Sequence, residues 1–241
     1  MDFTILFNSR NRVGLLQQML RSIESTAAAL LSLEVLVNFD DDDYASLSAI
    51  PLLEMEFAFF KPRINPREVN IHINVNKMAM EARGKYIWGL GDDCHILTKH
   101  WDKIASERFE HFLKDRPDRI AMGAVESTSV DKSPIHDWYT DAPIITREGR
   151  DALGYLIHPH FISLGADVAT NIIYKSVDRI VDMKEIVFDH VLHNTVERVV
   201  NPDQTAQEYR QRQAIRQPSD PWEYDYTEEI ALIRSKVERH E

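Results

Sequence analysis

The sequence contains a single cysteine, Cys94, and no long apolar segment. One thiol excludes an intramolecular disulfide and a zinc site built from several cysteines of the same chain. The longest apolar run, about residues 27–31, is far shorter than the roughly 20 residues that a membrane-spanning helix needs. No basic segment followed by an apolar stretch opens the chain, so we expect no secretory signal and predict a cytoplasmic protein.

Positive charge is also scarce. The chain carries 28 Lys and Arg against 39 Asp and Glu, which gives a formal net charge of −11. Because general binding to nucleic-acid backbones requires a basic surface, we expect no such function. A single nucleotide could still bind, since a few local groups and a metal ion would suffice.

The composition that remains is that of an ordinary globular protein. With 241 residues, 44% hydrophobic and 28% charged, the chain suits one sizeable α/β domain, alone or with a short appendage. Apolar runs at 3–7 and 33–39 predict strands, and apolar residues at helical spacing over 13–31 predict a helix between them. A crossover this long joins parallel strands, so we expect a mostly parallel central sheet flanked by helices.

The α/β alternation extends to about residue 125 and then becomes less regular. Val69, Ile71, Ile73 and Val75 alternate with polar residues, which predicts a half-exposed strand. Further elements are expected over 76–83 (a helix that ends at Gly84), 85–90 (strand), 101–113 (helix), 119–125 (strand), 146–155 (helix), 168–176 and 186–200. Residues 127–143 are expected to form a polar loop, and residues 201–241 a helical or extended C-terminal tail.

Two acidic clusters follow predicted strands, Asp40 to Asp43 after the second strand and Asp92-Asp93 after the strand over 85–90. In an open parallel sheet, ligands bind beyond the carboxyl ends of the strands, so both clusters are expected to face one crevice. Hard divalent cations such as Mg²⁺ or Mn²⁺ favour oxygen ligands and are often completed by substrate phosphates. Structural roles stay open: a solvated turn for the first cluster, and a helix N-cap or loop pair for the second.

Three stretches stand in a characteristic order. They are residues 5–12 (ILFNSRNR), residues 37–41 (VNFDD), and Asn76 followed by residues 82–93 (ARGKYIWGLGDD). Together they resemble the inverting family-two type of GT-A glycosyltransferases, over about residues 3–125. The resemblance implies a GT-A-like nucleotide-binding domain, and the absence of a Gly-rich phosphate loop is typical of that family rather than of Rossmann or P-loop enzymes.

The resemblance also implies a nucleotide-diphosphate-sugar donor and a pocket for it in residues 1–125. Asn8, Ser9 and Arg10 would line the nucleotide pocket. Asp40 or Asp41 would accept a hydrogen bond from the base.

The resemblance also implies a bound metal ion. Asp93 would hold Mn²⁺ or Mg²⁺ against the diphosphate, and Asp92 would lie near the ribose or the metal. Gly91 stands where the family's Asp-x-Asp motif has its first aspartate. A late histidine often completes the metal site in this family, which makes His190 a candidate ligand, with His193 next.

The acceptor side would come from residues 126–200. Inverting transfer needs a general base, and Asp167 occupies the place of the family's base; its alternative is an N-terminal helix residue that interacts with the helix dipole. Trp138 is a candidate platform for an acceptor sugar, with buried packing as the alternative. Residues 201–241 would be a C-terminal extension.

The sequence therefore predicts a metal-dependent glycosyltransferase that moves a sugar from a nucleotide-diphosphate donor to an acceptor hydroxyl with inversion. Two alternatives keep the fold: a sugar-phosphate nucleotidyltransferase and a catalytically degenerate GT-A-like binding domain. The acceptor stays open between a glycan, a lipid-linked sugar, a protein and a small molecule. A membrane acceptor would require peripheral association with the membrane.

Overall fold

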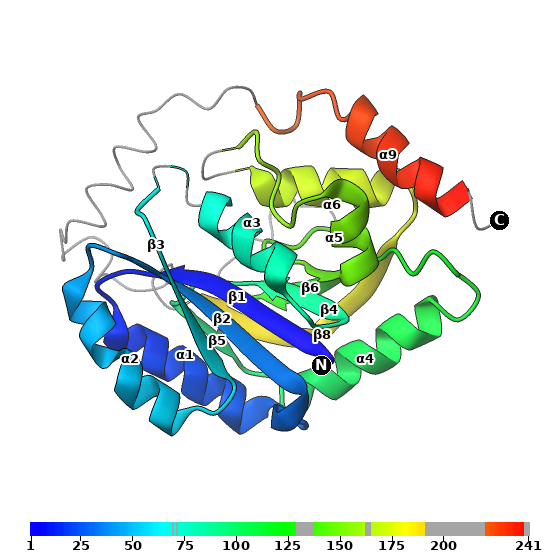
Figure 1. Cartoon of the computed structure of the whole chain (residues 1–241). Coiled ribbons are helices and arrows are strands. Elements are labelled where there is room, and N and C mark those ends of the chain that lie inside the picture. The colour runs from blue at the N-terminus through cyan, green and yellow to red at the C-terminus, as the bar shows by residue number, and fades with distance from the viewer. Residues whose placement is uncertain (69, 71, 129–136, 162–164, 191–219, 239–241) are drawn as a thin grey trace.

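A computed structural model describes residues 1–68, 70, 72–128, 137–161, 165–190 and 220–238 of the chain. Its centre is one eight-stranded sheet with the strand order β3-β2-β1-β4-β7-β6-β8-β5 (Figure 1). The strands are β1 (Phe3–Ser9), β2 (Leu33–Asp40), β3 (Phe60–Asn65), β4 (Tyr86–Gly89), β5 (Cys94–Ile96), β6 (Met122–Ser127), β7 (Ile144–Thr146) and β8 (Ile180–His190).

Most of the strands run in the same direction. β3, β2, β1 and β4 pair in parallel. β7 is antiparallel to both β4 and β6, so β6 runs with β4, and β8 is parallel to β6. The carboxyl ends of β1, β2, β4, β6 and β8 therefore lie along one edge of the sheet, and the strand order reverses between β1 and β4, where such sheets bind ligands. The expected mostly parallel sheet is confirmed.

Helices cover both faces of the sheet. The described α-helices are α1 (Val13–Thr26), α2 (Tyr44–Glu56), α3 (His72–Glu81), α4 (Trp101–Phe112), α5 (Arg147–Leu153), α6 (Ala166–Ser176) and α9 (Thr227–Val237). α1, α2 and α4 pack on one face, and α3, α5, α6 and α9 pack on the other (Figure 1). None of these helices is both long enough and apolar enough to cross a membrane.

The environment of β1 explains why its sequence is mostly apolar. Ile5 and Phe7 belong to the core on the α1 side, whereas Leu6 belongs to the core on the α3 side. A strand buried on both faces is apolar at nearly every position, and the exception, Thr4, donates its hydroxyl hydrogen bond to Glu34, so residues 3–7 are typical of a central parallel strand.

The alternation over 69–75 predicts a strand, and this prediction is wrong. α3 begins at His72, so Ile73 and Val75 lie on a helix. Val75 and Met78 are buried at helical spacing, whereas Ile73 is 38% exposed. The first two of the alternating residues lie outside the described part of the chain.

The outer strand next to β2 is instead β3. It is an edge strand in which Phe60 is the one buried residue, and Pro62 is tolerated because one side of the strand has no partner strand in the described part of the chain. Such a strand lacks a period-two apolar pattern, so sequence reasoning did not predict it. The expected helix over 13–31 also ends early, at Thr26, because Ala27 takes an extended conformation.

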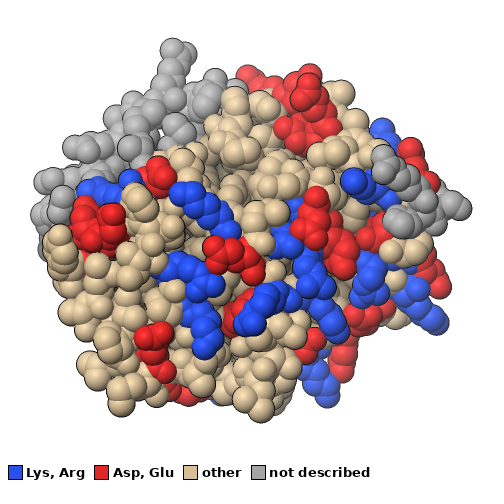
Figure 2. Space-filling model, in the orientation of Figure 1, with Lys and Arg blue, Asp and Glu red and all other residues tan. Residues whose placement is uncertain are grey.

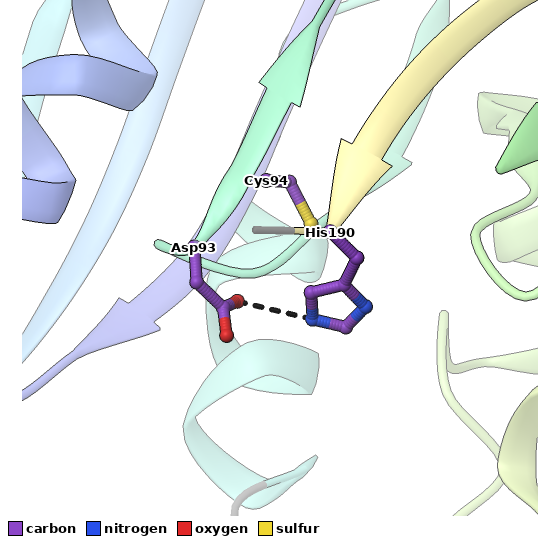
Figure 3. Close-up of side chains that lie close together, drawn as sticks. All are labelled: Asp93, Cys94 and His190. Atoms are coloured by element: carbon purple, nitrogen blue, oxygen red, sulfur yellow. Dashed lines mark hydrogen bonds and ion pairs between the residues drawn. The ribbon is translucent and has the colours of Figure 1, made fainter. Parts of the chain in front are cut away.

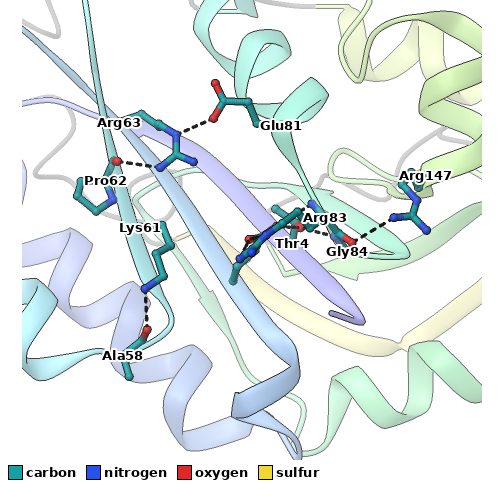
Figure 4. A network of polar contacts seen from close by, with 10 residues as sticks. Thr4, Ala58, Lys61, Pro62, Arg63, Glu81, Arg83, Gly84 and Arg147 are labelled. Atoms are coloured by element: carbon teal, nitrogen blue, oxygen red, sulfur yellow. Dashed lines mark hydrogen bonds and ion pairs between the residues drawn. The ribbon is translucent and has the colours of Figure 1, made fainter.

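A polar network holds the amino-terminal edge of the sheet, opposite the carboxyl ends (Figure 4). Glu34 is 2% exposed and accepts hydrogen bonds from Thr4 Oγ1 at 2.7 Å and Arg83 Nε at 2.9 Å. Burial alone would raise the pKa of Glu34, but these hydrogen bonds bring it below its ordinary value. Arg63 pairs with Glu81 at 2.7 Å across β3 and α3 (Figure 4). Figure 2 shows acidic and basic side chains intermixed on the face of the molecule seen in that view. The network holds the start of β4 against β1 and β2.

Candidate functional site

The carboxyl ends of the parallel strands bring together polar side chains that are far apart in the sequence. Ser9 ends β1, Asp40 ends β2 and His190 ends β8. Asp92 and Asp93 lie in the short turn between β4 and β5. These five residues are all among those predicted from the sequence.

Asp92 is held from β1 and from the start of α1. It is 4% exposed, and it accepts a hydrogen bond from Ser9 Oγ at 2.9 Å and from Arg12 Nη1 at 3.2 Å. Burial and the charge of Asp93 raise the pKa of Asp92 to about 6, against the opposing effect of Arg12. Arg12 is therefore the cation that compensates this carboxylate in the free protein.

Asp93 faces His190 (Figure 3). The carboxylate Oδ1 lies 3.1 Å from His190 Nε2, and Oδ2 lies 3.8 Å from Arg12 Nη1. Burial favours the neutral acid, but the hydrogen bond and charge of His190, with the charge of Arg12, bring the pKa of Asp93 below its ordinary value. The carboxylate is thus ionised and available to a cation.

Cys94 completes a cluster of metal-ligand type. It pairs with His190 across β5 and β8, and one ligand atom each from Asp93, Cys94 and His190 lie within 4.8 Å of one another. Burial raises the pKa of the Cys94 thiol well above its ordinary value. The set offers oxygen, nitrogen and sulfur, and the distance between the Asp93 and His190 atoms is about that of adjacent ligands around a cation with bonds of about 2.1 Å. Asp93 and His190 therefore fit a divalent metal, whereas Cys94 would have to lose its proton to join them.

The first acidic cluster divides into two parts. Arg10 Nη1 pairs with Asp40 at 3.1 Å and also pairs with Asp42. Burial raises the pKa of Asp40, and the charge of Arg10 opposes this. Asp43 is buried and caps α2 by accepting a hydrogen bond from the amide of Ser46 at 3.2 Å, so its role is structural.

The remaining predicted positions on this side lie close by in the sheet. Asn8 precedes Ser9 on β1 and is half-buried. Asp41 is exposed, and its amide donates to the carbonyl of Asn65 at 3.0 Å beyond the end of β3.

Asp167 lies in the first turn of α6, and the hydroxyl of Tyr139 donates a hydrogen bond to its carboxylate. Burial and the charge of Asp167 raise the pKa of Tyr139. Trp138 points elsewhere: it lines a cavity of about 310 Å³ with Lys175 and Asp178, near the other end of α6. The candidate His193 lies outside the described residues.

Sequence reasoning missed three residues of this region. Arg12 stands in the stretch that carried the resemblance and could have been found there. Cys94 follows the acidic pair directly, but its proximity to His190 depends on strand pairing. Asp141 stands in the polar stretch that was expected to be a loop, and no local pattern marks it.

Several solved structures share this fold. TarS of S. aureus (residues 1–349) has a TM-score of 0.63 at 12% identity, over 98% of this chain and 71% of that one. The mannosyltransferase PcManGT of Pyrobaculum calidifontis, solved with GDP-Man and Mn²⁺, has a TM-score of 0.61 at 13% identity. The match covers 97% of this chain and 69% of PcManGT. GalNAc-T7, solved with UDP, GalNAc and Mn²⁺, has a TM-score of 0.61 at 13% identity, and the match covers 98% of this chain and 54% of GalNAc-T7.

At these identities the similarity establishes the fold. No protein-family model matches the sequence, and no curated protein matches it. The protein has the GT-A fold, as the resemblance of residues 3–125 implied.

Proposed function

We propose that this protein is a metal-dependent, inverting glycosyltransferase that uses a nucleotide-diphosphate-sugar donor. The observation that carries the proposal is the pair of Asp93 and His190, whose ligand atoms lie 3.1 Å apart beyond the ends of β4 and β8. The similar structures of PcManGT and GalNAc-T7 contain Mn²⁺ together with a sugar nucleotide or a nucleotide, which supports a bound cation in this fold.

The donor set favours Mn²⁺ over Mg²⁺. Imidazole nitrogen is a ligand that suits transition metals, whereas Mg²⁺ prefers oxygen throughout. When bound, the cation would offset the negative charge that develops on the leaving nucleoside diphosphate. Asp93 and His190 would hold it, and Cys94 is the third donor-type group of the cluster.

The proposed nucleotide pocket lies beside this pair, where the strand order reverses. Arg10, fixed by Asp40 and Asp42, would present its guanidinium to the pocket. Asp92, oriented by Ser9 and Arg12, would accept a hydrogen bond from the ribose. The full set of proposed pocket residues is Asn8, Ser9, Arg10, Asp40, Asp41 and Asp92.

The proposed base is Asp167. It would take the proton of the acceptor hydroxyl as that oxygen attacks the anomeric carbon and the bond from this carbon to the phosphate oxygen breaks. A single in-line displacement of this kind inverts the anomeric configuration. The Tyr139 hydroxyl orients the Asp167 carboxylate in the free protein, and Trp138 remains a proposed acceptor-side residue.

Thermal unfolding with nucleotides tests the proposal. UDP, GDP, CDP and dTDP are each added with and without Mn²⁺, and one of them is expected to raise Tm in a Mn²⁺-dependent manner. The corresponding sugar nucleotides are then assayed for release of the nucleoside diphosphate. Asp167→Asn should abolish turnover but keep nucleotide binding, and the exposed Asp115→Asn should change neither.

The outcomes separate the competing functions. Pyrophosphate release from a nucleoside triphosphate and a sugar phosphate would establish a nucleotidyltransferase instead. Nucleotide binding without turnover of any sugar nucleotide would indicate a degenerate binding domain. No Mn²⁺-dependent binding of any nucleotide would refute the proposal.

A further inference from the structure

Asp141 is a half-buried carboxylate without a role in the mechanism above, and the side chain of Ser127 hydrogen-bonds to it. It belongs to the segment that leads into β7, and its Oδ1 atom is buried with no hydrogen-bond partner among the described residues. Its charge interacts with that of His190, a proposed metal ligand, and with that of Asp167, the proposed base. Burying a polar group without a partner costs free energy, so an orphaned carboxylate oxygen beside a proposed active site points to a ligand.

The backbone on both sides of Asp141 is fixed. The amide of Thr140 donates to Asn171 Oδ1 at 3.0 Å, and the Thr140 carbonyl accepts from Asn171 Nδ2 at 2.7 Å. On the other side, Trp88 Nε1 donates to the carbonyl of Ala142 at 2.9 Å. Asn171 belongs to α6, which carries the proposed base, and Trp88 belongs to β4, which leads to the proposed metal residue. The position of Asp141 is therefore set by the two elements that hold the reacting groups.

The geometry of the proposed reaction limits what can lie beside this carboxylate. In an in-line displacement, the sugar must lie between the leaving diphosphate, near Asp93 and His190, and the acceptor hydroxyl, near Asp167. Asp141 interacts with the charges at both ends of this line. It is not part of the cluster of ligand atoms around Asp93, so a role as a direct metal ligand is not favoured.

Resting on the proposed function, we infer that Asp141 accepts hydrogen bonds from hydroxyl groups of the sugar that the donor transfers. An ionised carboxylate is purely an acceptor, and a sugar hydroxyl would supply the donor that the Oδ1 atom lacks among the described residues. Hydrogen bonds to a charged acceptor are about twice as strong as neutral ones, so this contact would contribute to selection of the donor sugar.

Calorimetric titration in Mn²⁺ tests this inference. UDP is compared with UDP-glucose and UDP-GlcNAc, and GDP with GDP-mannose, on wild type, Asp141→Asn, Asp141→Ala and the exposed control Asp137→Asn. Asp141→Asn should bind the nucleoside diphosphate within twofold of wild type and lose about tenfold in affinity for the matching sugar nucleotide. Asp141→Ala should lose more affinity for the sugar nucleotide than Asp141→Asn does, and Asp137→Asn should keep the affinity of wild type.

Stability of the free variant separates a ligand-binding role from a structural one. Because the Asp141 Oδ1 atom is buried without a hydrogen-bond partner among the described residues, Asp141→Asn should leave Tm equal to or above that of wild type; a lower Tm would overturn the inference. Unchanged affinity for the sugar nucleotide, or an equal loss for the nucleoside diphosphate, would overturn it and leave the proposed function standing. Failure of wild type to bind any nucleoside diphosphate would overturn both.

Discussion

Gly165 precedes the helix that carries Asp167, and its replacement by alanine tests how the C-terminal segment is packed there. The residue has φ 91°, and a Cβ atom would lie 2.7 Å from Pro221 Cγ. Left-handed backbone costs a non-glycine residue about 1–2 kcal/mol. Overpacking costs a further 1–3 kcal/mol or so. Gly165→Ala is therefore expected to lower the free energy of unfolding by about 2–5 kcal/mol.

Two other glycines provide matched controls. Gly154 ends α5 with φ 80°, but a Cβ there would meet no atom within 4 Å, so Gly154→Ala should cost the backbone term alone, about 1–2 kcal/mol. Gly14, in the first turn of α1, has open space and an ordinary conformation, so Gly14→Ala should stabilise by up to about 1 kcal/mol. The difference between Gly165→Ala and Gly154→Ala isolates the contact with Pro221.

Urea denaturation gives the free energies, and thermal unfolding gives a second measure, at about 2–4 °C per kcal/mol for a chain of this length. Equal destabilisation by Gly165→Ala and Gly154→Ala would refute the close packing of Pro221. Because the strain lies two residues before Asp167, Gly165→Ala should also lower kcat in the proposed transfer while the affinity for the nucleoside diphosphate stays within twofold.

Three further predictions concern other parts of the molecule. In wild type, a nucleoside diphosphate with Mn²⁺ should stabilise the folded protein by roughly 2.7 kcal/mol at a hundredfold excess over Kd, seen as a rise in Tm. Asp93→Asn should abolish this rise, and a retained rise would place the metal elsewhere. His158 is buried 3.0 Å from Glu229 of α9, and burial lowers its pKa despite that partner. The unfolded chain therefore binds a proton first as pH falls below about 6.5, so stability should fall on acidification, and less so in His158→Gln, as measured by Tm between pH 7.5 and 5.5. Asp102 accepts two backbone amides of the loop after α1, both at 2.8 Å, so Asp102→Asn should cost about 2 kcal/mol in urea denaturation, and an unchanged midpoint would contradict these bonds.

The central strands could be predicted because their environment leaves a local pattern. β1 and β2 are buried on both faces, so each is mostly apolar, with the buried polar residues Thr4 and Glu34 near the start and polar residues at the end. The remaining strands lack such a pattern. The edge strand β3 has one buried residue, and β5 and β7 have three residues each, which is too few to show a periodicity. In α3 the apolar residues satisfied the spacing of a strand and of a helix at once, and the packing of Val75 and Met78 against the sheet selected the helix.

The candidate site divides in the same way. Asp92 and Asp93 could be identified because they directly follow a strand, and the chain direction sends all such ends of parallel strands to one edge. Asp141 could not be identified, because its charge interactions with His190 and Asp167 depend on tertiary packing rather than on its neighbours in the chain.

By itself, the sequence determined the α/β class, the parallel sheet and the acidic residues at its carboxyl edge, because hydrophobic periodicity and the succession of strands and helices along the chain are local properties. The tertiary structure alone decided which of those residues meet. Asp93 and His190 are 97 residues apart, and the antiparallel pairing of β5 with β8 brings their side chains to 3.1 Å. That pairing depends on long-range hydrogen bonds and shared burial, which no short stretch of sequence encodes.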